Sequence, residues 1–289
     1  MLIQGKFLNV IQNNRDEIRK KYFGLSVSKV KTFKQCKAKY FFSYIKKLPR
    51  KEWEHLTFGK FLHEVLERFE KEILGLDFNN KSIPKSKLPD HLLMKKCFSD
   101  ALVEWGPQMT SENKKESFKI LCEFLQKRAD AKKAGTLPEV LFAEKDFNVD
   151  IGNDVMMNGF IDVIQRDTDG VLHVADYKTS KSKEYLKKDW MQLKVYAYVM
   201  CLEDPNLQKV RCSYIMLRHK FDSIIKEFSR DEVMGMEEDF RDYAKTIHDE
   251  KLFRPKPSPL CGYCDYVDHC EEGQNRLGIK KNGFGATDW

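Results

Sequence analysis

One stretch of the chain constrains the fold more than any other, and it runs from Val171 to Thr179 as VLHVADYKT. Nonpolar side chains fall on both faces at the two-residue period of a strand, which predicts a buried central strand. Asp176 and Lys178 point to the same side at the end of this strand. A carboxylate and an ammonium are costly to bury unless they are paired or bind a metal. The strand end is a candidate functional site, although the triplet alone is equally typical of a salt bridge.

A second carboxylate is expected beside Asp176. The turn DTDG at 167–170 separates the central strand from the strand predicted at 155–164, and its residues favour a hairpin. Antiparallel pairing about this turn places Asp162 opposite Asp176 within about one residue. Two carboxylates suit Mg²⁺, which prefers oxygen ligands and leaves positions for a phosphate oxygen and an attacking water. Lys178 could orient or help deprotonate that water and offset negative charge.

The remaining periodicity predicts an α/β fold in which a mixed central sheet is flanked by helices. Further strands are predicted at 139–149, 208–217 and 223–228. Helices are predicted at 6–22, 25–36, 57–69, 90–105, 112–133, 184–202 and 230–251. We interpret the helices between 89 and 135 as an insert or lid, and residues 273–289 as a flexible tail.

Length and composition favour a single domain over residues 1–289. With 42% hydrophobic residues, the chain can bury a sizeable core without disulfides. The start lacks a signal-peptide pattern and no apolar stretch reaches the ~20 residues of a membrane span, so we expect a cytoplasmic protein that does not bind a membrane. A formal net charge of +7 favours a polyanionic partner. Within the domain we expect an N-terminal helical part at 23–70, a helical insert at 89–135, a core at 138–250 and a cysteine segment at 253–272.

Three closely spaced cysteines, Cys261, Cys264 and Cys270, indicate a metal site rather than disulfides. A tetrahedral site or an iron–sulfur cluster needs a fourth ligand, for which Cys36 is the best remote candidate. Spacing alone does not separate zinc from iron–sulfur, and His269 lies nearby in the sequence. Either metal would tie the two ends of the chain together. The other cysteines lie singly in apolar patterns and are expected to be small buried side chains: Cys97, Cys122, Cys201 and Cys212.

Two helices carry further polar candidates at a spacing of four residues. His63 and Glu67 share one face of the helix predicted at 57–69, and Gln192 and Tyr196 share one face of a later helix. A lone helical histidine is usually structural, so His63 gains weight only from its context. Strand alternation leaves open whether Glu144 faces solvent or the site.

Six motifs follow one another in an order that resembles RecB-like nucleases of the PD-(D/E)XK superfamily, over about residues 23 to 272. They are Phe33-x2-Cys36-x3-Tyr40, Gly59-x3-His63-x3-Glu67, Gly159-x2-Asp162, Asp176-Tyr177-Lys178-Thr179, Gln192-x3-Tyr196 and Cys261-x2-Cys264-x5-Cys270. The nearest resemblance is to the iron–sulfur branch, which includes the AddB nuclease domain and CRISPR-associated RecB-like exonucleases. The individual motifs are weak, but their order is specific.

The resemblance implies a role for each matching residue. Asp162, Asp176 and the carbonyl of Tyr177 would hold Mg²⁺ or Mn²⁺, with His63 as a further ligand, and Lys178 would act on the water. Further roles follow for residues outside this centre. Gln192 and Tyr196 would position DNA or brace Lys178, Lys181 and Lys183 would contact DNA, and Cys36, Cys261, Cys264 and Cys270 would hold a [4Fe-4S] cluster, with structural zinc as the alternative.

The function that the resemblance implies is metal-dependent hydrolysis of DNA. An exonuclease acting on single-stranded DNA or duplex ends is favoured, in recombination, repair or phage or CRISPR DNA processing, with a helicase or recombination protein as a partner. One alternative is a DNA-binding accessory module that cuts nothing, and another is a structure-selective endonuclease. The intact set of Asp162, Asp176, Lys178 and His63 argues against the accessory module.

Overall fold

The computed structural model describes residues 23–51 and 53–279, so the helix predicted at 6–22 lies outside the described residues. Six strands form one mixed sheet within this part of the chain. They are β1 (Phe23–Leu25), β2 (Glu139–Asp150), β3 (Val155–Arg166), β4 (Leu172–Lys178), β5 (Lys209–Met216) and β6 (Asp222–Ser229). None of the helices in the described ranges combines the length and apolar character that crossing a membrane requires.

The sheet has the order β1-β3-β4-β5-β6, with β2 also paired to β3. Strand β4 pairs antiparallel with β3 and parallel with β5, which makes it a central strand. The β3–β4 hairpin closes through the turn, where the amide of Asp167 donates to the carbonyl of Val171 at 3.0 Å. Five consecutive residues of β4, from His173 to Tyr177, are buried. The predicted central strand and its hairpin are therefore confirmed.

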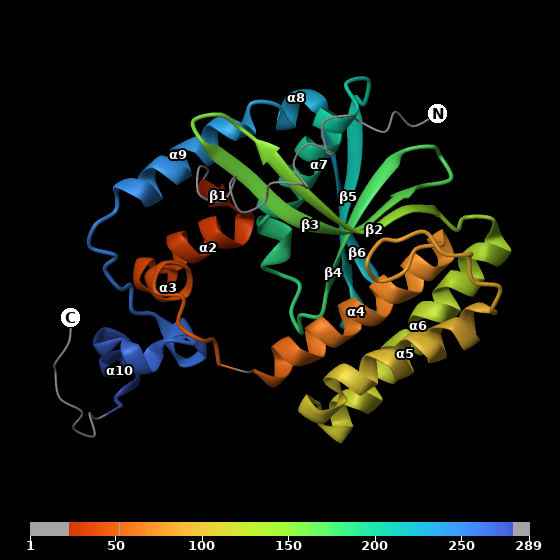
Figure 1. Cartoon of the computed structure of the whole chain (residues 1–289), viewed down its shortest axis with the longest axis horizontal. Coiled ribbons are helices and arrows are strands. Elements are labelled where there is room, and N and C mark those ends of the chain that lie inside the picture. The colour runs from red at the N-terminus through yellow and green to blue at the C-terminus, as the bar shows by residue number, and fades with distance from the viewer. Residues whose placement is uncertain (1–22, 52, 280–289) are drawn as a thin grey trace.

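Helices cover both faces of the sheet (Figure 1). One face packs against α2 (Val27–Gln35), α7 (Met191–Glu203), α8 (Arg230–Val233) and α9 (Met236–Asp249). The other face packs against α4 (Glu54–Leu74), α5 (Asp90–Trp105) and α6 (Ser111–Ala134). The mixed α/β architecture expected from the sequence is thus the one observed.

A small third cluster joins the two ends of the described chain. Helix α3 (Lys37–Tyr40) and the turn of π-helix after it lie beside the cysteine segment, where Ala38 and Phe42 pack against Tyr266. Helix α10 (Glu271–Leu277) follows this segment, and Figure 1 shows it on the same side of the molecule as α3. Segments more than 200 residues apart in the sequence are therefore neighbours.

The helix predicted at 184–202 begins only at Met191, so the prediction was wrong for its first seven residues. Tertiary contacts hold these residues out of the helix. The Trp190 ring stacks on Tyr214 with 6.1 Å between ring centroids, and the Tyr214 hydroxyl donates to the carbonyl of Asp189 at 2.8 Å. Packing on β5 outweighs the helical propensity of the segment.

Three other predictions need correction. The helix predicted at 230–251 is broken at Gly235, whose φ of 90° is left-handed and ends the helical path. The start of the predicted tail at 273–289 lies in α10, which the Cys270 sulfur caps by accepting the Gly273 amide at 3.4 Å. Cys122 is exposed rather than buried.

Candidate active site

Gly59 lets helix α4 approach the end of β4. A Cβ atom at Gly59 would lie 3.1 Å from Thr179 Oγ1, which is tighter than ordinary packing. One helical turn later, His63 faces the sheet, and its Nδ1 lies 3.4 Å from Asp162 Oδ2. The helix that carries the motif histidine therefore meets the strand that carries the first motif aspartate.

Asp162 of β3 and Asp176 of β4 lie opposite one another at the point where the ladder between these two strands ends. The last pair of this ladder is Val163 with Ala175, and the two aspartates occupy the next opposed positions. The amide of Tyr177 donates to Asp162 Oδ2 at 2.7 Å. Asp176 is 2% exposed. Lys178 Nζ lies 2.5 Å from Asp176 Oδ2, but outside hydrogen-bonding geometry, and this oxygen has no hydrogen-bond partner among the described residues.

Helix α7 supplies a polar bracket around Asp176 and Lys178. The side chain of Gln192 donates to Asp176 Oδ1 at 2.8 Å and to the Tyr196 hydroxyl at 2.7 Å. Its carbonyl oxygen accepts a hydrogen bond from Lys178 Nζ at 3.1 Å. Tyr196 is 4% exposed and its hydroxyl lies 3.4 Å from Asp176 Oδ1. This burial favours bracing over DNA contact for Tyr196.

The electrostatics of the site are those of carboxylates partly balanced by cations. Burial raises the pKa of Asp176 to about 6, although Lys178 acts in the opposite direction. Burial also opposes the charge on Asp162, yet His63 and the Tyr177 amide hold the pKa of Asp162 below its ordinary value. Burial disfavours a charged imidazole, but Asp162 raises the pKa of His63 to about 9. For Lys178, the attraction of Asp176 outweighs burial and raises the pKa.

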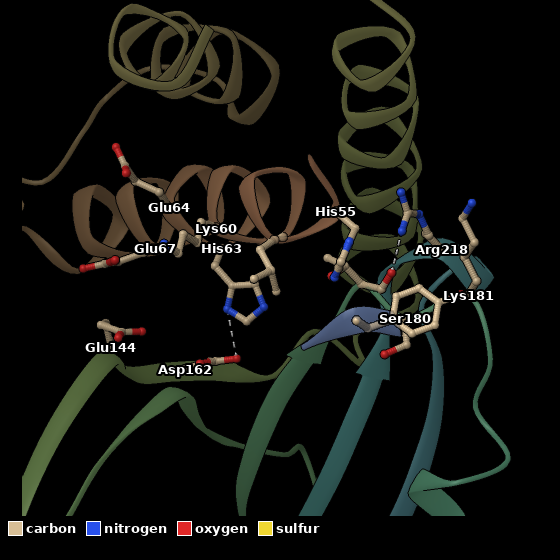
Figure 2. A pocket seen from close by; sticks show the side chains of 14 residues that line it. His55, Lys60, His63, Glu64, Glu67, Glu144, Asp162, Ser180, Lys181 and Arg218 are labelled. Carbon is tan, nitrogen blue, oxygen red and sulfur yellow. Dashed lines mark hydrogen bonds and ion pairs between the residues drawn. The ribbon is translucent and has the colours of Figure 1, made fainter. Parts of the chain in front are cut away.

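A cavity of about 920 Å³ opens beside these strand ends. Figure 2 shows its acidic part, where Glu67 on helix α4 lies above Glu144 and Asp162 of the sheet. The side chain of His63 points from α4 toward Asp162. Asp176, Lys178, Gln192 and Tyr196 are not among the residues that line the cavity, and hydrogen bonds from Gln192 connect them to one another. The rest of the cavity wall is formed by His55, Leu56, Lys60, Ser180, Lys181, Arg218 and Tyr263, among others.

Glu144 of β2 also faces the site. Strand alternation had left open whether its side chain faces the site or solvent. The β2–β3 ladder pairs Ala143 with Val163 and Lys145 with Ile161, so Glu144 lies opposite Asp162. Its φ of 47° is left-handed, which is strained for a glutamate. Burial, together with Asp162 and Glu67, raises the Glu144 pKa to about 7. The pairing of β2 with β3 reveals this neighbour, and that pairing joins two strands whose register the sequence analysis did not predict.

The basic residues near the site do not behave alike. Lys181 lines the cavity, whereas Lys183 forms an ion pair with Asp222 and is not among the lining residues. Arg218, which the sequence did not single out, lines the cavity and donates to the carbonyl of Thr179 at 2.9 Å. Its guanidinium also pairs with Glu116 of α6 at 2.8 and 3.0 Å. Helix α6 is thereby attached to the end of β4.

The four cysteines of the predicted metal site line one small, largely apolar cavity. Backbone amides donate to three of the sulfurs at 3.4 Å each, namely Lys256 to Cys36, Ser258 to Cys261, and Gly273 to Cys270. Such donors favour a thiolate, which is the form of cysteine that binds metal.

At neither predicted metal site are the side chains already arranged as a set of metal ligands. Across the described ranges, no group of three or more His, Cys, Asp or Glu side chains has the arrangement of a metal site. The donor chemistry nevertheless fits the two groups. Hard carboxylate oxygens, one of them on Asp176 without a hydrogen bond, suit Mg²⁺ or Mn²⁺. Four sulfurs in one cavity with amide donors suit an iron–sulfur cluster or zinc.

The chain is similar to known proteins in sequence and in fold. One subunit of the ATP-dependent helicase/deoxyribonuclease from Streptococcus pyogenes serotype M3 is 26% identical over 164 residues, which are 55% of this chain and 14% of that protein. The same subunit from serotype M6 is 27% identical over the same length. The chain therefore spans about 14% of the length of these curated relatives. A crystal structure of a candidate exonuclease from Eubacterium rectale has a TM-score of 0.52 and 12% identity over 95% of both chains, a likeness of fold.

The family match covers most of the chain and includes every motif discussed above. Residues 24–271 match the family described as the PD-(D/E)XK nuclease superfamily. This range begins at β1 and ends in α10, so it includes the sheet, the helices on both faces and the cysteine segment. The chain belongs to the PD-(D/E)XK nuclease superfamily.

Proposed function

We propose that this protein is a metal-dependent deoxyribonuclease that hydrolyses phosphodiester bonds, acting as an exonuclease on single-stranded DNA or DNA ends. The observation that carries the proposal is the meeting of Asp162, Asp176 and Lys178 on the adjacent strands β3 and β4, with His63 beside Asp162. A binding module has no need of two opposed carboxylates and a lysine beside a cavity.

The metal would be held by Asp162, Asp176, the carbonyl of Tyr177 and His63. The carboxylate oxygen of Asp176 that lacks a hydrogen bond supports this assignment, because it keeps lone pairs free for a metal although Lys178 balances its charge. When bound, Mg²⁺ or Mn²⁺ supplies Lewis-acid activation of water and screens the charge that develops on the phosphate. Glu144, which lies opposite Asp162, is a further candidate for this set.

The protein's own groups set the geometry of hydrolysis. A water oxygen forms a bond to phosphorus while the bond from phosphorus to the leaving sugar oxygen breaks, and that oxygen takes up a proton. The raised pKa of Lys178 favours its ammonium form, so Lys178 orients the water and stabilises negative charge rather than removing a proton. Gln192 holds Asp176 and Lys178 at a fixed separation by bonding to both.

Replacing Gln192 with alanine is expected to lower cleavage about 10- to 100-fold, the usual cost of losing a group that orients metal ligands. The change frees both Lys178 and Asp176 while leaving their charges intact. Rates measured over a Mg²⁺ titration should show a higher metal requirement. Gln208→Ala, which removes a hydrogen bond only to Asn206, serves as the control. An unchanged metal requirement in Gln192→Ala would contradict the bracing role.

Replacing Glu144 with asparagine is expected to separate stability from activity. Asparagine tolerates the left-handed backbone better and carries no charge, so the free energy of unfolding should rise by about 1 kcal/mol. Cleavage should fall about 10-fold or more if Glu144 serves the metal. Asp154→Asn is the matched control, because Asp154 has a φ of 56° but does not line the cavity. Thermal melts and cleavage rates, measured on the same preparations, report the effects on stability and on activity separately. Full activity in Glu144→Asn would remove Glu144 from the site.

The cysteine cavity supports the finer proposal of a [4Fe-4S] cluster held by Cys36, Cys261, Cys264 and Cys270, with zinc as the alternative. Such a group would clamp the N-terminal helical part to the cysteine segment. The three amide–sulfur hydrogen bonds support this role, because hydrogen bonds to the sulfurs are a feature that tunes such clusters.

The activity is tested by a cleavage time course on end-labelled single and double strands with Mg²⁺, Mn²⁺ or EDTA. Release of mononucleotides or short products from an end, abolished by EDTA, is the expected result. A closed circular single strand distinguishes the endonuclease alternative, since only an endonuclease opens it. Binding of DNA without any cleavage would favour the accessory module. Because the relatives are subunits of a helicase/deoxyribonuclease, we also propose a helicase partner.

A further inference from the structure

The cavity has two chemically different ends. Its acidic end holds Asp162, Glu67 and Glu144, where the proposed metal would lie. Figure 2 shows that His55, Ser180, Lys181 and Arg218 gather toward the opposite end. Phosphates would be repelled by the first end without a metal and attracted by the second. The second end therefore has the charge to receive the flanking part of a nucleic-acid strand.

Tyr263 adds an aromatic ring to this basic end, from the cysteine segment. It lies between two of the proposed cluster cysteines, in the short 3-10 helix Pro259–Tyr263, and it lines the cavity. Its side chain is 69% exposed. A large ring left open at the mouth of a charged cavity is available to a ligand.

The surroundings of Tyr263 hold the ring in place without covering it. Its centroid lies 6.5 Å from that of Trp53, which lies 6.0 Å from His55. The indole of Trp53 donates to Asp265 Oδ1 at 2.5 Å, which ties the start of α4 to the cysteine segment. Leu56, 44% exposed, adds apolar surface to the same end. Ring and aliphatic surface suit a flat apolar group, whereas phosphate would gain nothing from them.

We propose that Tyr263 is a stacking platform for an unpaired nucleobase of the DNA strand that enters the cavity. This inference rests on the proposed function and makes it more specific, because a base inside a duplex is stacked on both faces by its neighbours and cannot stack on an aromatic ring. The strand would place a base on Tyr263 and its phosphates near Lys60, Lys181 and Arg218. The strand would run from there toward Asp162. The site thereby selects single-stranded DNA at the end of the cavity opposite the proposed metal.

The test measures binding without cleavage. Fluorescence anisotropy in EDTA compares a labelled 12-nucleotide single strand with a blunt duplex of the same sequence. Tyr263→Ala is expected to weaken single-strand binding about 10-fold, as loss of one stacked base does, and to leave duplex binding within about twofold. Tyr263→Phe should bind like the unmodified protein, because the ring and not the hydroxyl carries the effect. Phe118→Ala, which removes an exposed ring on α6 outside the cavity, is the matched control.

An abasic substitution provides a second test that needs no altered protein. In a series of single strands, each strand carries one abasic nucleotide at a different position. We expect the unmodified protein to bind one of these strands about 10-fold more weakly than the intact strand. Tyr263→Ala should bind that strand and the intact strand equally. The proposal would be overturned if Tyr263→Ala bound the single strand as tightly as the unmodified protein does, or if it lost affinity for single strand and duplex to the same degree. It would also be overturned if the losses from the substitution and from the abasic nucleotide were additive. Since these measurements contain no metal, absence of cleavage in the Mg²⁺ assay would refute the proposed nuclease activity without deciding the role of Tyr263.

Discussion

Replacing Asp176 with asparagine is expected to reduce Mg²⁺-dependent cleavage by more than about a thousandfold, since interactions that support charge in the transition state are worth about 10²–10⁴-fold each. The variant keeps the size of the side chain and its contact with Gln192 but loses the charge opposite Lys178. Lys178→Ala should lose activity to a similar degree, because it removes the ammonium that orients water.

The two variants differ in what they do to metal binding. Asp176→Asn should weaken the Mn²⁺ affinity measured by calorimetry, whereas Lys178→Ala should keep or strengthen it by freeing Asp176 Oδ2. Asp130→Asn, on the exposed face of α6, is the control and should cleave normally. Full Mg²⁺-dependent activity in either variant would show that Asp176 and Lys178 do not form the centre where phosphodiester bonds are cut.

Replacing Cys36 with serine is expected to remove both the colour and much of the stability of the protein. Anaerobically purified protein should be brown and contain iron and sulfide, and the Cys36→Ser variant should be colourless. Structural metal sites contribute several kcal/mol to folding, so a loss of about 5 kcal/mol would lower the melting temperature by roughly 10 °C. The effect is large because Cys36 is the only one of the four cysteines that comes from the N-terminal helices.

The exposed Cys122 offers a matched control for this experiment. Cys122→Ser should leave iron content, colour and melting temperature unchanged. Colourless protein with one zinc per chain would replace the iron–sulfur cluster with a zinc clamp. Protein that contains neither metal and melts like Cys36→Ser would show that the four sulfurs only pack together.

Local patterns in the sequence were enough to predict the core of the site. The strand that ends in Asp176 was evident because a buried strand leaves a two-faced apolar period. Its pairing with Asp162 followed from the turn at 167–170, whose residues specify a hairpin and hence a register. Helical spacing placed Gln192 and Tyr196 on one face, and both bond to Asp176.

The residues that the sequence did not assign to the site depend on contacts between distant segments. Glu144 reaches the cavity from a bulged strand through a left-handed backbone, which no period of two reveals. Arg218 pairs with Glu116 and Tyr263 lies beside Trp53, and each of these partners is far away in sequence. The late start of α7 has the same origin, since packing of Trp190 on Tyr214 overrides helix propensity. Local patterns predict the secondary structure of a segment, whereas long-range packing decides which other segments it contacts.

The burial of β4 on both faces has a consequence for motion. Its middle residues, Val174 and Ala175, are fully buried, one in each hydrophobic cluster, so this strand can open only when the whole domain unfolds. Tyr263 has no such place in the core, because it lies in a short exposed 3-10 helix between Cys261 and Cys264, where the proposed cluster would hold its turn. The atoms proposed for the chemistry and the ring proposed to meet the substrate would thus be held by different means, one by the hydrophobic core and the other by a metal group. Loss of the cluster is therefore expected to weaken the capture of a strand before it disturbs the catalytic centre.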